Sequence, residues 1–458
     1  MIRMTAGELA TAVGGRLQGD PGTEFSGVFT DTRSPREGGL FVALRGPRFD
    51  AHDYLDAALP AAPVLLLRRA RTDLPVAQVV VPDTGEALGR LAAAWRARCD
   101  ARVIALTGSN GKTTTREMLR SILARMGRVH ATEGNLNNEV GTPLTLLAMP
   151  ADTEFAVIEL GANHAGEVGR MAAWASPQVA LITNAGHAHL EGFGSLEGVA
   201  HAKAEIFSGL PSQGGTAVVN LDDPFADYWL SLNEHHHRQR FSLEGGGEVE
   251  GAWIAPDRLL ITILGAGREV RLASPGRHVA ANAVAAAAAA NAVGAGIDTV
   301  AAGLAAWRPV AGRLQACRHA GGARIWDDSY NANPDSLRAG LEVLASVPGR
   351  RLLVLGEMGE LGAESAELHA AIGREARAMG IDACLALGEQ GRAVAEAFGE
   401  GGEWFPDHAA LVARLEGLLD EHTTVLVKGS RSQHMERIVE ALDVQPVDPE
   451  AVDAVRAD

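Results

Sequence analysis

The 458-residue sequence lacks the features of secreted and membrane proteins. Its three cysteines, Cys99, Cys317 and Cys384, lie far apart without the spacing of metal ligands, so we expect neither disulfides nor a zinc site. The first 15 residues lack the basic start and apolar core of a signal peptide. No stretch of about 18 residues is apolar on all sides, as a membrane-spanning helix would be. We therefore expect a cytoplasmic protein.

Positive charge and aromatic side chains are also scarce. Lys and Arg number 41 against 57 Asp and Glu, a net charge of −16, which argues against nucleic acid or an anionic membrane surface as the main partner. Any anionic substrate must then be bound by a local cluster of Lys, Arg and backbone N–H groups. Aromatic residues make up 5% of the chain, but the apolar content of 47%, mostly Ala, Leu and Val, can fill several cores. At this length we expect two to three domains.

Short apolar segments alternate with helical patterns along the chain, which predicts an α/β protein with mostly parallel sheets. Residues 1–98 form a small α/β unit, residues 99–311 carry apolar strands at 103–106, 155–160, 179–183 and 217–221, and residues 312–458 form a third α/β unit. The alanine-rich stretch 280–293 is expected to be a tightly packed helix, because Ala is the strongest helix former. The three histidines at 235–237 lie in a polar stretch and favour a solvated loop over a metal site.

The most informative run is Thr-Gly-Ser-Asn-Gly-Lys-Thr-Thr-Thr at 107–115, which follows the strand 103–106 and precedes a predicted helix from Thr113 to about Arg125. Such a turn binds phosphate, because glycine lets backbone N–H groups surround the anion and the helix start adds partial positive charge. Lys112 can reach the terminal phosphates, and Thr113 can ligate Mg²⁺. Leu106 stands where a standard P-loop has its first glycine, so the loop is abbreviated. The sequence therefore predicts nucleotide use.

Further polar residues follow the other predicted strands, at the edge where open α/β sheets bind ligands. Glu159 lies near the end of the strand 155–160. Its carboxylate either binds the Mg²⁺ that Thr113 ligates or caps a helix. His187 and His189 follow the strand 179–183 and could be metal ligands, bases or ordinary loop residues. Lys203, taken alone, is typical of a solvated helix charge.

These segments occur together in an order that resembles the Mur ligase family over nearly the whole chain. Besides the loop at 107–115, the resemblance rests on Gly-Asn-Leu-Asn-Asn-Glu-Val-Gly at 134–141, Val-Ile-Glu-Leu-Gly at 157–161, Thr-Asn at 183–184, Ala-His-Leu-Glu-Gly-Phe-Gly at 188–194, Lys203 before Glu-Ile-Phe at 205–207, Pro-Gly-Arg-His at 275–278, Asn-Ala at 282–283, Gly-Arg-Leu at 312–314, Asp-Asp-Ser-Tyr-Asn-Ala-Asn-Pro at 327–334 and Val-Lys-Gly-Ser-Arg at 427–431. It implies an N-terminal UDP-sugar-binding domain (1–98), a central P-loop-type ATPase domain (99–311) and a C-terminal Rossmann-like α/β domain (312–458).

The resemblance also implies how ATP and two Mg²⁺ ions bind. Thr113 and Glu159 would bind one Mg²⁺, and His189 would help bind the second. Lys203 matches the lysine that CO₂ carbamylates in this family, which turns a cation into an anionic oxygen ligand suited to Mg²⁺. The resemblance implies that Asn282 contacts the adenine of ATP and that Asp328 contacts the ribose. The residues implied for the ATP phosphates are Gly108, Ser109, Asn110, Gly111, Lys112, Thr113, Thr114 and Arg313.

For the other substrates, the resemblance is to the family member that uses a D-alanyl dipeptide, and the run at 327–334 is the most discriminating. Tyr330, Asn331 and Asn333 fall where the dipeptide is expected, although a turn and a helix N-cap would use the same residues. The positions implied for the UDP-linked substrate are Thr30, Asp31, Arg33, Asp50, His52, Asn135 and Asn138.

The activity implied is ATP-dependent joining of D-alanyl-D-alanine to UDP-N-acetylmuramoyl-tripeptide through an acyl phosphate, which yields the pentapeptide precursor of peptidoglycan. The partners implied are these small molecules alone, with no nucleic acid or membrane, and the protein is expected to be a monomer.

Alternatives remain open. The related ligase that adds a diamino acid to the dipeptide precursor carries an Asp-Asn-Pro-Arg motif, whereas this chain has Asn-Pro-Asp at 333–335. Folate polyglutamation enzymes share the ATP unit but lack a segment like 31–52. A catalytically silent nucleotide-binding regulator is the third alternative. The joint presence of Lys112, Glu159, His189 and Lys203 speaks against it.

Overall fold

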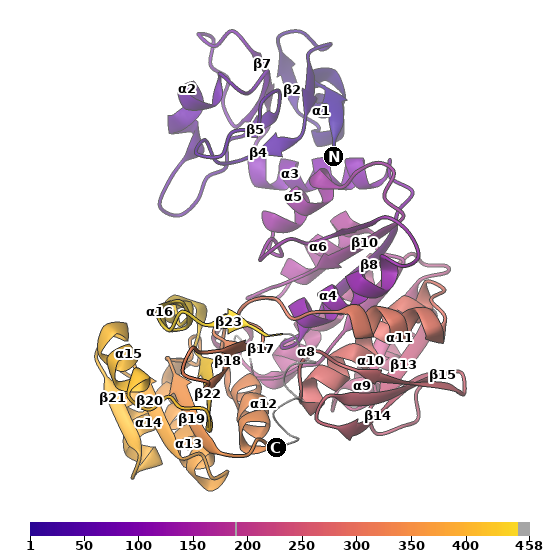
Figure 1. The fold of residues 1–458 in the computed structure, drawn as a ribbon. Helices are drawn as coiled ribbons and strands as arrows, with labels where there is room; N and C mark the ends of the chain where they lie inside the picture. Colours follow the sequence, from indigo (N-terminus) through magenta and orange to yellow (C-terminus); the bar gives the residue numbers. More distant parts are fainter. Residues whose placement is uncertain (188–189, 448–458) are drawn as a thin grey trace.

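The structure is a computed structural model that describes residues 1–187 and 190–447. Three main sheets follow one another along the chain (Figure 1). The N-terminal sheet lies at one end of the molecule, the central sheet lies in the middle, and the C-terminal sheet lies beside the central one. The α/β class with parallel-rich sheets is confirmed.

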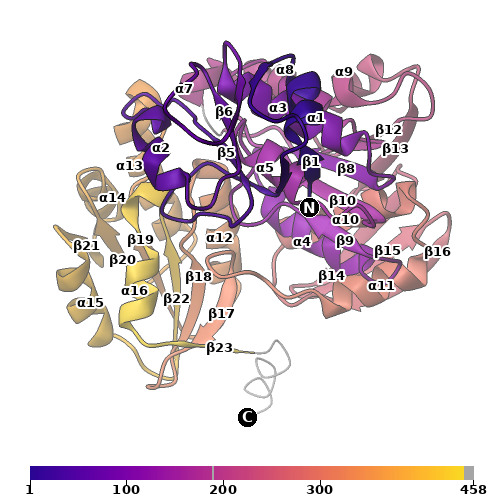
Figure 2. The same cartoon turned by 90° about the horizontal axis from the view of Figure 1, so that it is seen from above.

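The N-terminal sheet has five strands in the order β2-β7-β6-β5-β4, and all but β2 run parallel. A separate pair, β1 with β3, lies beside α5 of the central part, where Ile2 N donates to Leu147 O over 2.8 Å (Figure 1, Figure 2). The elements are β1 (Arg3–Thr5), α1 (Ala6–Val13), β2 (Arg16–Gln18), β3 (Glu24–Ser26), β4 (Val28–Phe29), β5 (Leu40–Val42), α2 (Leu55–Ala58), β6 (Val64–Leu67) and β7 (Ala77–Val80).

Helix α3 (Thr84–Arg96) joins this sheet to the central part. It begins at Asp83, whose carboxylate accepts a hydrogen bond from Glu86 N over 2.9 Å and so satisfies an open helix-end N–H. Its apolar face, with Leu88 and Leu91, belongs to one buried cluster that includes residues of both sheets. The N-terminal and central parts therefore share a core.

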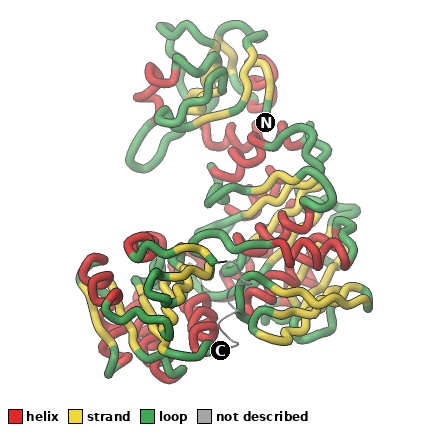
Figure 3. Tube along the Cα trace, viewed as in Figure 1, coloured by secondary structure: helices red, strands yellow, loops and turns green. Residues whose placement is uncertain are grey.

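The central sheet has nine strands in the order β16-β15-β14-β13-β12-β11-β8-β10-β9, and only the β14-β15-β16 meander is antiparallel. Figure 3 draws the strands in yellow and the helices in red. Its elements are β8 (Arg102–Thr107), α4 (Lys112–Leu123), β9 (Val129–Ala131), α5 (Gly141–Ala148), β10 (Phe155–Glu159), α6 (Glu167–Ala175), β11 (Val179–Ile182), α7 (Leu190–Phe193), α8 (Leu196–Ala204), β12 (Thr216–Asn220), α9 (Ala226–Leu232), β13 (His237–Ser242), β14 (Val249–Ala255), β15 (Arg258–Ile263), β16 (Ala266–Arg271), α10 (Arg277–Ala292) and α11 (Ile297–Ala306).

Alternate residues of β8 show why this sheet is covered on both faces. Val103 and Ala105 belong to the cluster that contains α5 and α6, whereas Ile104 and Leu106 belong to the cluster that contains α4 and α10. Side chains alternate between faces along a strand, so a continuous apolar run requires helices on each side. The predicted alanine-rich helix is confirmed as α10, whose alanines between 283 and 290 are at most 1% exposed and pack against α4 and the sheet.

The C-terminal sheet has seven strands in the order β21-β20-β19-β22-β18-β17-β23, where β17 pairs antiparallel with both β18 and β23 and the other pairs are parallel. One apolar cluster continues from α10 of the central part to Trp326 and Leu353 in this sheet. The elements are β17 (Gln315–Arg318), β18 (Arg324–Asp328), α12 (Pro334–Ala345), β19 (Arg350–Leu355), α13 (Ser365–Ala378), β20 (Ala383–Leu387), α14 (Gly391–Phe398), β21 (Gly402–Phe405), α15 (His408–Glu416), β22 (Thr423–Lys428), α16 (Glu436–Ala441) and β23 (Gln445–Pro446).

The histidine-rich stretch differs in part from the predicted loop, because His237 is the first residue of β13. Only Phe241 and Ser242 at the end of that strand are buried, so its sequence carries little strand signal. Within residues 1–187 and 190–447, no cluster of three or more His, Cys, Asp or Glu could hold a metal ion. Across the same residues, no helix is long and apolar enough to cross a membrane.

The contact between α11 and α4 depends on Gly303, where a Cβ atom would stand 2.5 Å from Ile122 Cα. Gly303→Ala should lower the melting temperature, because overpacking costs about 1–3 kcal/mol and exceeds the gain of about 1 kcal/mol in helix propensity. Gly296→Ala, at the start of the same helix with no atom within 4 Å, is the control. Thermal denaturation followed by circular dichroism compares the two, and equal melting temperatures would contradict this packing argument.

Candidate functional site

A cavity of about 810 Å³ is lined by residues of both the central and the C-terminal parts. It lies beyond the carboxyl ends of the parallel strands β8, β10 and β11 of one sheet and β18 and β22 of the other. Open α/β sheets bind ligands at this edge. The site residues predicted from sequence that line it are Ser109, Asn110, Gly111, Lys112, Thr113, Thr114, Asn135, Asn138, Glu159, Asn282, Arg313, Asp328, Tyr330, Asn331 and Asn333.

The loop between β8 and α4 has the backbone that the sequence predicts for phosphate binding. Gly108 and Gly111 have φ angles of 150° and 79°, in the region that favours glycine. A Cβ atom at Gly108 would stand 1.9 Å from Thr183 Oγ1, and one at Gly111 would stand 2.0 Å from Asn282 Oδ1. Glycine is therefore required at both positions by conformation and by space.

Lys112 is the first residue of α4 and folds back over this loop. Its Nζ donates to the carbonyl oxygens of Gly108, over 2.6 Å, and Ser109, over 3.1 Å. Loss of water around the ammonium lowers the pKa of Lys112 to about 8. The side chain thus lies where a bound phosphate could replace the two carbonyls as the partner of its charge.

Thr113 and Glu159 are brought together as predicted, with 3.5 Å between Thr113 Oγ1 and Glu159 Oε1. Glu159 is 2% exposed and ends β10, so the sheet fixes its carboxylate beside the start of α4. Two further side chains orient it: Arg116 NH1 donates to Oε2 over 2.9 Å, and Asn137 Nδ2 donates to Oε1 over 2.8 Å. Hydroxyl and carboxylate oxygens converging in this way are the donors that Mg²⁺ prefers.

Lys203 lies in α8 and is 1% exposed, so the alternative of a solvated helix charge is wrong. Its Nζ lies 5.2 Å from the centroid of the Phe193 ring, and among the described residues it forms no ion pair. Burial, reinforced by the charge of Lys112, lowers the pKa of Lys203 to about 7. His189, the other predicted ligand in this region, lies outside the described residues.

On the C-terminal side, Arg313 reaches across to the phosphate loop. Its NH2 donates to Thr113 Oγ1 over 3.4 Å, and its guanidinium carbon lies 4.1 Å from the centroid of the Tyr330 ring. Asp328, at the end of β18, pairs with Lys428 Nζ over 2.6 Å. The structure therefore gathers the predicted ATP residues around one cavity, while their individual contacts with phosphate, ribose and adenine stay predictions.

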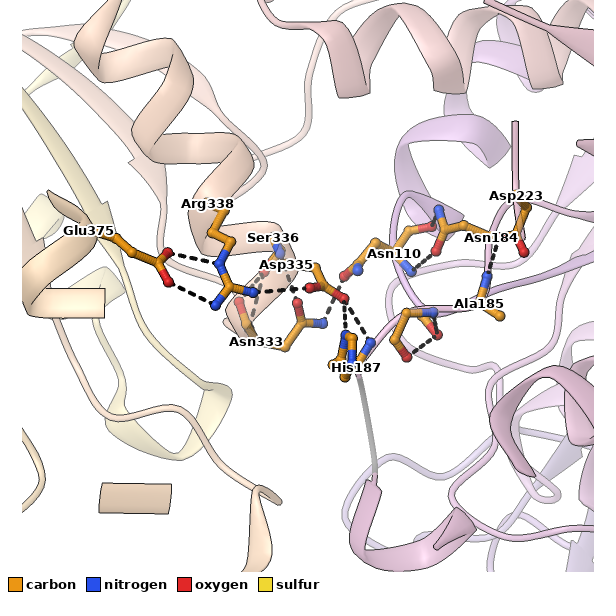
Figure 4. Close-up of polar contacts among 12 residues, drawn as sticks. Asn110, Asn184, Ala185, His187, Asp223, Asn333, Asp335, Ser336, Arg338 and Glu375 are labelled. Carbon is orange, nitrogen blue, oxygen red and sulfur yellow. Dashed lines mark hydrogen bonds and ion pairs between the residues drawn. The ribbon is translucent and has the colours of Figure 1, made fainter. Parts of the chain in front are cut away.

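Asn110 is the point where the phosphate loop meets the C-terminal part (Figure 4). Its backbone N donates to Asn184 Oδ1 over 3.0 Å, and its carbonyl accepts from Asn184 Nδ2 over 3.1 Å. Its side-chain Oδ1 accepts from Asn333 Nδ2 over 2.8 Å. Asn333 is also the N-cap of α12, with Oδ1 accepting from Ser336 N over 2.8 Å. The cap alternative is thus correct for Asn333, and the same side chain also touches the phosphate loop.

His187 makes a further contact between the two parts, also drawn in Figure 4. Its backbone N donates to Asp335 Oδ2 over 2.7 Å, and its Nδ1 lies 3.2 Å from the same oxygen. Arg338 NH1 donates to Asp335 Oδ1 over 3.4 Å, and the same guanidinium forms an ion pair with Glu375 over 2.8 Å. Behind the loop, Asp223 accepts a hydrogen bond from Ala185 N over 2.8 Å. His187 therefore positions the central loop against α12.

The predicted UDP-sugar residues of the N-terminal part do not line this cavity. Thr30, Asp31 and Arg33 follow β4, and Arg33 pairs with Asp31 over 2.7 Å at an exposed position. His52 Nδ1 hydrogen-bonds Asp50 Oδ1 over 2.5 Å, and His52 Nε2 accepts from Arg68 N beyond the end of β6. The two groups share the carboxyl edge of the N-terminal sheet, so they could belong to one ligand there.

Several site residues were missed by the sequence reasoning, among them Arg116, Asn137, Asn184, Asp335 and Lys428. Arg116 had a detectable signal, because a helix residue four positions after Lys112 faces the same side of α4. Asn137, Asn184 and Lys428 lie in motifs that were recognised without a role for these residues, and Asp335 directly follows the run at 327–334. Of the two asparagines predicted nearby, Asn135 lines the cavity, and Asn138 also shapes the backbone by accepting from Gly141 N over 2.8 Å.

Lys112→Ala should abolish binding of Mg²⁺-ADP and leave the fold intact, because the hydrogen bonds of Lys112 Nζ within the described part of the chain go only to carbonyls of its own loop. Isothermal titration calorimetry measures the binding, and thermal denaturation measures the fold. Arg120→Ala, an exposed change on the same helix, should bind Mg²⁺-ADP like the unaltered protein. Unchanged nucleotide affinity in Lys112→Ala would contradict the assignment of the loop.

Two family models match this chain, the Mur ligase middle domain over residues 106–290 and the Mur ligase glutamate ligase domain over residues 312–431. The UDP-N-acetylmuramoyl-tripeptide–D-alanyl-D-alanine ligase of Escherichia coli strain K12 is 45% identical over 450 residues, which is 96% of this chain and 99% of that protein.

Two solved structures are similar over most of the chain. MurF from Acinetobacter baumannii has a TM-score of 0.90 and 36% identity, covering 96% of this chain and 99% of that one. MurF ligase from Thermotoga maritima in complex with ADP has a TM-score of 0.78 and 27% identity, covering 91% and 97%. The resemblance seen in the sequence is confirmed: the chain belongs to the Mur ligase family, and over nearly its whole length it is similar to ligases of the tripeptide–D-alanyl-D-alanine type.

Proposed function

We propose that the protein joins D-alanyl-D-alanine to UDP-N-acetylmuramoyl-tripeptide in the cytoplasm, as a monomer, with hydrolysis of ATP to ADP and phosphate. The observation that carries the proposal is the contact between Asn110 and Asn333. It places the run at 327–334, which is the most discriminating for a dipeptide-adding ligase, directly against the phosphate loop. The acceptor amine and the terminal phosphate of ATP would then meet in one cavity.

The chemistry has two steps. The tripeptide carboxylate attacks the γ-phosphorus of ATP, so that ADP leaves and an acyl phosphate forms. The neutral amine of the dipeptide then attacks the acyl carbon, the amine loses a proton, and the tetrahedral intermediate expels inorganic phosphate. The reacting groups of the first step are both anionic, so cations held in fixed positions around them lower the barrier.

This chain supplies that positive charge from two sides. Lys112 would turn from the carbonyls of Gly108 and Ser109 to the β- and γ-phosphates, while Arg313 would approach the same phosphates from the C-terminal part. The Tyr330 ring lies against the Arg313 guanidinium and holds it in place at little cost in hydration. Backbone N–H groups at the start of α4 complete the phosphate cradle.

The oxygen pair of Thr113 and Glu159 fits Mg²⁺, since both are hard donors 3.5 Å apart. Bound there, Mg²⁺ would neutralise phosphate charge and orient the γ-phosphoryl group. Arg116 and Asn137 keep the Glu159 carboxylate turned toward Thr113. A second Mg²⁺ would take His189 and a carbamylated Lys203 as ligands.

Carbamylation suits the surroundings of Lys203. The reaction consumes the neutral amine and CO₂ and yields a carbamate anion and a proton, so a buried amine that loses its charge easily is the right substrate. The product would be an anionic oxygen ligand near the end of α8. A permanently charged lysine at a position 1% exposed would need a counter-ion to offset its desolvation.

We further propose that the three sheets correspond to domains with boundaries near 98 and 311. The N-terminal domain would bind the UDP-sugar through Thr30, Asp31, Arg33, Asp50 and His52. Since these residues do not line the cavity, the substrate must extend from that domain to the phosphate loop, or the domain must move toward it. Closure would also exclude water, which hydrolyses acyl phosphates.

The acceptor amine tests the function directly. D-alanyl-D-alanine should produce phosphate in the presence of ATP and UDP-N-acetylmuramoyl-tripeptide, whereas diaminopimelate, lysine and glutamate should not. A coupled phosphate assay measures the rates, and mass spectrometry identifies the product. A parallel assay replaces the tripeptide with the UDP-N-acetylmuramoyl-dipeptide precursor, and a faster reaction of a free diamino acid with that dipeptide would identify the related ligase instead. Nucleotide binding without turnover for any acceptor and either precursor would identify the silent regulator.

Lys203→Ala and Lys203→Arg should both lose most activity, because neither side chain forms a carbamate, although arginine keeps the positive charge. Acetate or formate should restore part of the rate in Lys203→Ala by supplying the missing anion. The same salts should leave Lys112→Ala inactive, which serves as the control. Full activity in Lys203→Arg would show that the charge alone matters.

An independent measurement is ¹³C NMR with ¹³CO₂. A carbamate signal should be present in the unaltered protein and absent from Lys203→Ala. Its persistence in that variant would assign the carbamate elsewhere.

A further inference from the structure

The distribution of lysine in this chain is unusual. Lysine occupies three positions, Lys112, Lys203 and Lys428, while arginine occupies the other 38 positions with a strongly basic side chain. Lys112 and Lys428 line the cavity, and Lys203 is buried close enough to Lys112 for the two charges to affect each other. A chain that uses arginine nearly everywhere else keeps lysine only around this site. The first two lysines have roles in the proposed function, and the third has none.

Lys428 is the last residue of β22, and its side chain is 3% exposed. Its Nζ donates to Asp328 Oδ2 over 2.6 Å and to the carbonyl oxygen of Asn331 over 2.9 Å. A Cβ atom placed on Gly340 of α12 would stand 3.9 Å from Lys428 Cδ, so the helix packs closely along the stem of the side chain. The ammonium is therefore enclosed and bonded to two different parts of the neighbouring backbone.

Each of these two bonds leads to a residue of the proposed ATP site. The other oxygen of Asp328 accepts from Leu314 N over 3.2 Å, which fixes the segment that carries Arg313. The Asn331 carbonyl lies in the loop that carries Tyr330, whose ring lies under the Arg313 guanidinium. One ammonium thus fixes both the backbone of Arg313 and the ring on which it rests.

We propose that Lys428 is a positioning residue of this ligase, which holds Arg313 and the loop 329–333 in the arrangement needed for phosphoryl transfer; the inference rests on the proposed function. A compact ammonium bonds a carboxylate and a carbonyl at tetrahedral angles. The longer, planar guanidinium of arginine cannot do so within the same enclosed space. This difference explains why lysine is retained here.

The test compares Lys428→Arg and Lys428→Met with the unaltered ligase. Both variants should lose about 100-fold in kcat, the loss expected when a catalytic group is misplaced by about 1 Å. The KM for UDP-N-acetylmuramoyl-tripeptide should stay within about threefold, because neither Lys428 nor Arg313 is among the predicted contacts of this substrate. Rates are divided by the number of Mg²⁺-ADP sites found by calorimetry, so that unfolded protein does not count as lost catalysis. Arg96→Lys is the matched control, a buried cation that donates to the carbonyls of Cys99 and Ala175 away from the cavity; its kcat should not change.

A double-mutant cycle with Arg313→Ala separates positioning from general structure. If Lys428 acts through Arg313, Lys428→Arg should cost much less in the Arg313→Ala background than alone. Equal costs in both backgrounds, or a kcat of Lys428→Arg within threefold of the unaltered ligase, would overturn the inference. Failure of the proposed function is distinguishable, because the unaltered protein would then release no phosphate in response to D-alanyl-D-alanine.

Discussion

The repulsion between a carboxylate and a triphosphate is the constraint on which the site depends. The chain carries a net charge of −16, so its average field opposes the approach of both substrates. The cavity overcomes this by gathering cations from separate parts of the chain: Lys112 from α4 and Arg313 from the segment before β17. Charge placed this close acts with little screening by water, and it therefore outweighs the more distant acidic surface.

Parallel sheets make this gathering possible. Every parallel strand directs its carboxyl end to the same edge, so residues separated by hundreds of positions become neighbours without long loops. Glu159 ends β10 and lies beside the start of α4, whereas Asp328 and Lys428 stand opposite each other in the β18–β22 pairing. The apolar strands provide rigidity, and the polar residue at each strand end provides chemistry.

Much of this could be predicted from sequence, because the signals were local. The strand, turn and helix around Lys112 follow from glycine placement and apolar patterning, and the strands β8, β10, β11 and β12 of the central sheet were located in the same way. The burial of Lys203 could not be predicted by such reasoning, since a lysine in a short helix has the same local pattern whether the helix faces solvent or a sheet. Strand β13 was missed because most of its residues remain partly exposed. The joint role of Asn333 as a helix cap and as a partner of Asn110 depends on the packing of two domains, which no local pattern contains.

Two kinds of contact join the central and C-terminal parts. One holds the two parts together, and the other fixes the relative position of their loops. The apolar cluster that continues from α10 to Trp326 is non-directional, so it holds the parts together while tolerating small shifts. Hydrogen bonds such as that between Asn110 and Asn333 weaken steeply with distance and angle, so they fix where the C-terminal loop stands relative to the phosphate loop. Because Asn110 is itself held at both its N–H and its carbonyl by Asn184, a displaced phosphate loop would also displace the partner of Asn333. The position of the phosphate loop and that of the C-terminal loop are therefore linked through the Asn110 side chain, beside the contacts that Arg313 makes with Thr113 and that His187 makes with Asp335.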